Sequence, residues 1–126
     1  MSDELQAYQV EFTEFMDQYK KNGVTNGEAV GAAISRLAQY FSTKNISVSI
    51  KEAALAKVAA KTVSSFDDNT GKPISVSKAD ILIKATDEAK ALMIEKAHLQ
   101  SIEQYINALK YLQKGILNEY SHMGGN

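Results

Sequence analysis

The apolar positions of this chain recur with helical spacing along most of its length. In residues 1–21 they fall alternately three and four residues apart, which is the rhythm of a coiled seam. The members of this aromatic stripe are Leu5, Tyr8, Phe12, Phe15 and Tyr19. So much apolar area on one face indicates a buried helix, packed either against its own chain or against another subunit.

Two shorter helices and a loop are predicted for residues 22–76. Thr25 and Glu28 have the spacing of a capping box that opens the first of these helices. Its apolar stripe is Val30, Ala33, Ile34, Leu37 and Phe41. Residues 45–48 alternate between apolar and polar, but the run is too short to support a sheet. Ser49 and Glu52 form a second capping box, ahead of an alanine-rich helix over residues 50–66.

The longest predicted helix covers residues 77–121, after a loop of turn residues at 67–75. Ser77 with Asp80 would cap it. Such a helix would span roughly 65 Å, whereas a domain of this length has a radius of gyration of about 14 Å. Part of it must therefore pack on another subunit or fold back at a kink that the sequence does not mark. Its apolar period shifts after Leu92, which indicates two packing environments. Residues 122–126 are predicted to form a disordered tail.

These patterns predict an all-α fold of four helices in a single domain of 126 residues. The long C-terminal helix would contribute to a homo-oligomer, either a helical bundle or a ring. The chain has no cysteine, which excludes disulfides and thiolate metal sites. Neither a signal peptide nor a membrane-spanning run is recognised, so we expect a cytoplasmic protein without a membrane partner.

Charge is unevenly distributed although the net charge is only −1. Residues 1–19 contain five acids and no base, so the rest of the chain holds all 14 lysines and arginines. One interpretation is a detachable acidic helix on a mildly basic body. The other is that acids simply favour the N-terminal part of a helix.

Catalytic chemistry is poorly represented in the sequence. His98 lies within a predicted helix and has Glu95 as its single potential co-ligand at helical spacing. The loop at residues 66–73 contains Gly71-Lys72, but Phe66 stands where a phosphate-binding loop needs its first glycine and Pro73 stands where it needs Ser or Thr. The same loop does not match an EF-hand either, because Lys72 and Lys78 stand where the EF-hand requires glycine and glutamate. We therefore expect neither an enzyme nor a cofactor or metal site.

Lysines flank the loop between the third and fourth predicted helices. Lys57 and Lys61 are four residues apart and so share a helical face. The candidate nucleic-acid-binding residues are Lys51, Lys57, Lys61, Lys72 and Lys78, with Lys84 nearby. Each phosphate that such lysines neutralise adds affinity through counterion release, and an oligomer would repeat the patch. The same residues could instead be a solvated face that only maintains solubility.

The third predicted helix contains Glu52-Ala53 followed by Lys57-Val58-Ala59-Ala60-Lys61. A glycine-containing loop, a long C-terminal helix and Gly124 come after it. In these features the chain resembles the UvsY-type phage recombination mediators, small ring-forming helical proteins that help to load a recombinase onto single-stranded DNA. The resemblance implies that Lys57 and Lys61 contact DNA, and that a phage-encoded protein would act in the host cell cytoplasm.

Two classes of function remain open from the sequence. The first is a phage-type accessory protein that binds single-stranded DNA and assists a recombinase or replication protein. The second is a helical structural or interaction protein, such as a virion or secretion-apparatus subunit or an adaptor, which assembles through its aromatic helix face. The candidate protein-interface residues are Leu5, Tyr8, Phe12, Phe15, Tyr19, Ile102, Ile106, Leu109 and Ile116.

Overall fold

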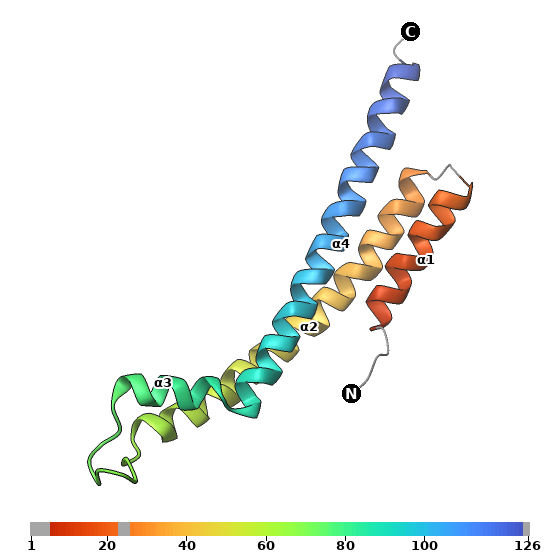
Figure 1. The fold of residues 1–126 in the computed structure, drawn as a ribbon. Coiled ribbons are helices and arrows are strands. Elements are labelled where there is room, and N and C mark those ends of the chain that lie inside the picture. The colour runs from red at the N-terminus through yellow and green to blue at the C-terminus, as the bar shows by residue number, and fades with distance from the viewer. Residues whose placement is uncertain (1–5, 23–25, 125–126) are drawn as a thin grey trace. The chain divides into compact units, whose positions relative to one another are not determined.

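The computed structural model describes residues 6–22 and 26–124, with side chains as far as Asn118. These residues form four α-helices and no strand, and the structure is 85% helical. The helices are α1 (Ala7–Asn22), α2 (Gly27–Val63), α3 (Val76–Lys84) and α4 (Asp87–Gly124), as Figure 1 shows. The predicted all-α fold with a long C-terminal helix is confirmed, and the homo-oligomer stays a prediction.

The chain divides into two compact units. The terminal unit combines Met1–Thr43 with Gln100–Asn126, and the central unit is Lys44–Leu99. Both α2 and α4 contribute to each unit. The change of packing environment predicted along the C-terminal helix therefore occurs within α4. That the whole chain folds as a single domain stays a prediction.

The terminal unit is built from α1, the first part of α2 and the second part of α4, which lie side by side (Figure 1). Its buried core is Tyr8, Val30, Ala33, Leu37, Ile102 and Leu109, none of them more than 2% exposed. The rings of Phe12 and Tyr105 stack with their centroids 4.1 Å apart. The aromatic stripe of α1 thus packs against its own chain. Of the two alternatives that the sequence left open, packing within the chain or against another subunit, the structure has the first.

The central unit has a much smaller core. Its buried hydrophobic residues are Val48 on α2, Ala79 on α3 and Leu92 on α4. Nine large hydrophobic side chains of this unit are instead exposed: Ile46, Ile50, Val63, Phe66, Val76, Ile81, Leu82, Met93 and Ile94. Since apolar surface in water is unfavourable, this unit has more apolar area than its own packing uses.

The prediction of two shorter helices in residues 22–76 is wrong, because α2 runs without a break through residues 42–49. Polar residues there remain helical, with the hydroxyls of Thr43 and Ser49 bonded to the carbonyls of Gln39 and Asn45 at 3.1 and 3.2 Å. This i−4 bonding lets Ser and Thr remain inside a helix. Ser49 is therefore not an N-cap. The helix ends at Val63, ahead of the predicted residue 66.

The long helix predicted over residues 77–121 forms two segments, α3 and α4, because it is interrupted between Lys84 and Asp87. The sequence alone had left open whether it was continuous or broken at an unmarked kink. The Thr86 hydroxyl accepts a hydrogen bond from the Ala89 N–H at 3.1 Å and so caps α4. Asp87 and Glu88 follow in the first turn, where acids are favoured. The chain thus contains a helix start at Thr86 that the unbroken apolar pattern concealed.

Helix ends differ from the predictions in three further places. Asn26 caps α2 by accepting from the Ala29 N–H at 2.7 Å, while Thr25 lies outside the described residues. Ser75 rather than Ser77 caps α3, with its side chain accepting from the Lys78 N–H. The C-terminal helix continues to Gly124, which corrects the predicted tail at residues 122–124. Residues 125–126 and 1–5 are outside the described part of the chain.

Candidate functional site

All the candidate DNA-binding lysines belong to the central unit, where they lie on three elements. Lys57 and Lys61 are exposed on the last turns of α2. Lys72 is exposed in the loop after α2, and Lys84 is exposed at the end of α3. These four ammonium groups are accessible to a polyanion, and the stretch from Ala53 to Phe66 contains no acid that would offset them.

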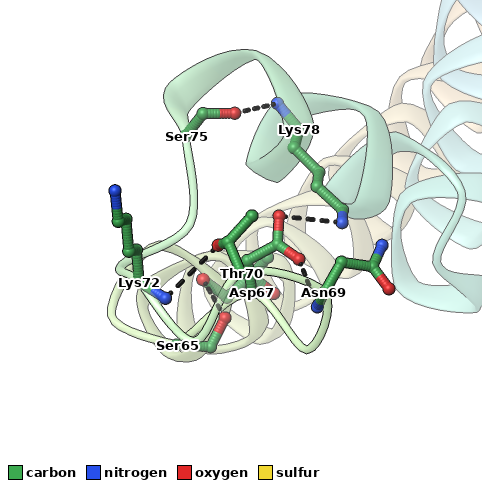
Figure 2. A network of polar contacts seen from close by, with 8 residues as sticks. Ser65, Asp67, Asn69, Thr70, Lys72, Ser75 and Lys78 are labelled. Atoms are coloured by element: carbon green, nitrogen blue, oxygen red, sulfur yellow. Dashed lines mark hydrogen bonds and ion pairs between the residues drawn. The ribbon is translucent and has the colours of Figure 1, made fainter.

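Lys78 differs from these lysines because it is engaged within the chain. Its Nζ lies 3.0 Å from Oδ2 of Asp67, and Figure 2 shows the pair closing the loop between α2 and α3. The hydrogen bond from Lys78 and that from the Asn69 N–H hold the pKa of Asp67 below its ordinary value. Lys78 therefore serves first to fasten the loop, and it is a weaker candidate for a phosphate contact than Lys57 or Lys61.

The loop itself is closed by backbone hydrogen bonds. Phe66 and Pro73 form an isolated antiparallel bridge, and the Asp67 N–H donates to the Lys72 carbonyl at 2.7 Å. Gly71 adopts a φ of 67°, a left-handed conformation that glycine accepts without steric cost. The Lys72 N–H also donates to the Thr70 hydroxyl (Figure 2). The loop therefore presents Lys72 from a defined turn.

Lys51 lies on the side of α2 that faces α4. Glu95 of α4 accepts hydrogen bonds from Lys44, at 3.2 Å, and from Ser47, and the charge of Lys51 also acts on it. Partial burial alone would raise the pKa of Glu95. The contacts with Ser47, Lys44 and Lys51 outweigh burial and leave the pKa below its ordinary value. Lys44 thus pairs with Glu95 inside the central unit. Lys51 lies near the same carboxylate and is only partly exposed, so it is a weaker candidate for a phosphate contact than Lys57.

Acid is expected to destabilise the central unit through these two carboxylates. Asp67 and Glu95 have lowered pKa values when folded, so the unfolded chain binds more protons as the pH falls below their ordinary values of 3.8 and 4.5. The stabilisation is present above that range and is lost as the pH drops through the folded values. Urea unfolding at about pH 7 and about pH 3 measures the loss.

The variant Glu95→Gln should reduce this loss of stability at low pH, whereas Glu52→Gln, at an exposed position of α2, should not. Equal pH dependence in both variants would contradict this assignment.

The candidate protein-interface residues of α1 and α4 lie in the terminal unit. Tyr8, Ile102 and Leu109 are at most 1% exposed in the core of that unit. Partly buried around them are Phe12, Phe15, Ile106 and Ile116, Tyr19 is half-buried, and Leu5 is outside the described residues. This corrects the expectation of an intersubunit surface for the buried members, because their apolar area is already used within one chain.

Within the described residues, no cluster of three or more histidine or acidic side chains could hold a metal ion. An open groove between α1 and α2 is lined by Val10, Glu11, Phe15 and Arg36, among others. Two of its three charged groups are paired with each other, since Arg36 donates to Glu11, and the third is Glu14. In the described part of the chain, no helix has the length and apolar content needed to cross a membrane.

The exposed apolar side chains of the central unit were missed by the sequence reasoning. Ile46 and Ile50 are 60% and 65% exposed on α2, yet the alternation at residues 45–48 was interpreted as a break between helices. If this stretch is interpreted as one helix, the two isoleucines are four residues apart and therefore share a face. The signal was therefore present, and a correct helix assignment would have found it.

Comparisons with known proteins leave the family open. No protein-family model matches the chain, and searches of curated proteins and of solved structures gave no significant match.

Proposed function

We propose that this chain is a non-enzymatic accessory protein that binds single-stranded DNA through the exposed lysines of its central unit. One observation carries the proposal: Lys57 and Lys61 are exposed one helical turn apart, on a stretch of α2 without acids. Lys72 and Lys84 add two further exposed cations in the same unit. Phosphates spaced along a flexible strand can contact exposed ammonium groups that are distributed over one unit.

A patch of this size gives weak, salt-sensitive binding in a single chain. Each neutralised phosphate releases counterions, so the affinity for a single strand falls as the salt concentration rises. The slope of log affinity against log salt is about −0.7 per phosphate neutralised. Phe66 is the one aromatic residue between Lys51 and Lys84, so base stacking contributes little and binding tolerates any sequence. Assembly of several copies would multiply the contacts. The proposed role is to present DNA to a recombinase or replication protein, as the resemblance to UvsY-type mediators suggests, in the cytoplasm of a phage-infected cell.

Charge reversal at the two central lysines tests the proposal. Lys57→Glu combined with Lys61→Glu should weaken binding of a labelled oligo-deoxythymidine at low salt by about tenfold or more, because two attractive contacts become repulsive. Fluorescence anisotropy measures the affinity. Lys57 and Lys61 are exposed, so helix content should be unchanged by circular dichroism.

A matched variant in the terminal unit controls for net charge. Lys110 and Lys114 are also exposed and four residues apart, on α4. Lys110→Glu with Lys114→Glu changes the net charge equally but should alter affinity by no more than about twofold. Absence of binding by the unaltered protein at low salt, or equal losses in both double variants, would refute the proposed site.

A second candidate function is a helical interaction protein that acts without DNA. The observation that favours it is the set of nine exposed large hydrophobic side chains in the central unit. The surface involved would then be in the central unit, because the aromatic face originally assigned this role is packed within the terminal unit. Assembly that persists unchanged in the absence of any DNA affinity would favour this second function.

A further inference from the structure

In the second half of α2, two lysines face the protein and two isoleucines face solvent, the reverse of the usual arrangement. Lys44, Val48 and Lys51 are spaced four and three residues apart and face α4, where Glu95 interacts with both lysines. Ile46 follows Lys44 by two residues, about 200° further around the helix. The lysines are therefore turned toward the protein, while Ile46 and Ile50 are turned toward solvent.

The outward face carries no charge over several turns. Ile46 and Ile50 are 60% and 65% exposed, and Ala53 continues the same line at helical spacing. The next residue on this line is Lys57, where the uncharged run ends. We call Ile46, Ile50, Ala53 and Ala54 the outer strip. A solvated helix face is ordinarily polar or charged, so this composition indicates a face that is covered in the assembled protein.

We infer that the outer strip is covered by the outer strip of a second copy, with the two α2 helices packed antiparallel about a two-fold axis near Ile50. The side chains of the strip are large at its N-terminal end, where the isoleucines lie, and small at its C-terminal end, where the alanines lie. Antiparallel packing sets each Ile46 against the Ala53 and Ala54 of the other copy, so large side chains meet small ones on both sides. Such self-complementarity is what a two-fold interface requires.

Charge selects the antiparallel orientation. In a parallel pair, Lys57 would face Lys57 of the other copy, and like charges in contact are destabilising. About the proposed axis, the two Lys57 positions are separated by 14 residues of helix rise, or about 21 Å. Each Lys57 then lies past the end of the outer strip, opposite the uncharged Thr43 of the other copy, and the contact does not depend on the proposed DNA binding.

The contact is small and should be weak. Two isoleucines and two alanines bury only a few hundred Å² per copy, below the roughly 800 Å² of a standard interface. We therefore expect dimers at protein concentrations of about 100 µM and dissociation on dilution. Sedimentation equilibrium without DNA should show this shift. Ile46→Lys with Ile50→Lys should weaken association at least tenfold, whereas Met93→Lys, at a 67% exposed site of α4, should not.

Cross-linking tests the orientation directly, because the chain has no cysteine of its own. With a bismaleimide too short to span about 20 Å, Ile50→Cys should give covalent dimers and Lys57→Cys should not. Efficient cross-linking at Lys57→Cys would show parallel packing and overturn the inference. So would a single-chain mass at every concentration, or a dimer indifferent to the paired lysine substitution. Because mass and cross-linking are measured without DNA, their outcome is distinguishable from failure of DNA binding.

Discussion

Replacing Ile102 by alanine should lower the free energy of unfolding by about 3 kcal/mol. Ile102 is 0% exposed in the core of the terminal unit, where it packs in one cluster with Leu37 and Leu109. Removing three buried carbons loses their transfer free energy and leaves a cavity that a close-packed core fills only partly. Urea unfolding followed by circular dichroism measures the change.

The matched control is Leu117→Ala, also on α4 and in the same unit but 60% exposed. Its cost should stay within about 0.5 kcal/mol. If the two substitutions cost the same, Ile102 is not in the core described here, and the packing of α4 against α1 and α2 would need to be revised.

Phe12→Asp should release α1 from the terminal unit. Phe12 stacks on Tyr105 at 4.1 Å, and Tyr105 also lies 5.8 Å from the ring of Tyr8. Aspartate loses this aromatic contact and brings a charge to an apolar site, a combined cost of about 3–5 kcal/mol. Hydrogen exchange of the α1 amides should therefore rise sharply toward that of an unfolded chain.

Thr13→Asp provides the comparison, since Thr13 is exposed on the same helix and receives the same charge. Its α1 amides should remain protected. The contrary result would be protected α1 amides in the Phe12 variant together with a reduced assembly mass. That result would mean that Phe12 contacts another subunit, which is the second of the two alternatives that the sequence left open for the aromatic stripe.

Helix type was predictable from the sequence because the apolar spacing in this chain is helical almost throughout. The stripe of Tyr8, Phe12 and Phe15 was recognised as a buried face, and the structure buries it. The sequence could not show what buries it, because the covering residues Leu37, Ile102 and Leu109 are distant along the chain. Contacts of that kind depend on how the helices pack.

Helix boundaries were predicted less well, for a local reason. Ser, Thr and Asn either cap helices or remain within them, and the choice depends on which carbonyl or N–H the side chain reaches. Ser49 bonds back to Asn45 inside α2, whereas Thr86 caps α4. Ser49 was predicted to be a cap and Thr86 was not recognised as one, because short-range spacing alone does not separate these two uses.

The exposure of the candidate lysines was predicted in part, and their role in binding DNA stays a prediction. Lys57, Lys61 and Lys72 are exposed as a DNA-binding role requires. Lys78 and Lys51 have internal roles, in a pair with Asp67 and beside Glu95. A lysine engaged by a carboxylate looks the same in sequence as an unengaged one, because its partner is brought near only by the fold.

The salt dependence of DNA affinity tests the account most directly. The slope of log affinity against log salt counts the phosphates that the protein neutralises, at about 0.7 per phosphate for single strands. Replacing Lys57 and Lys61 by glutamine should make the slope shallower by about 1.4, while the same change at Lys110 and Lys114 should leave it unaltered. An identical slope for the unaltered protein and the Lys57/Lys61 variant would contradict the central claim that these two lysines hold the strand.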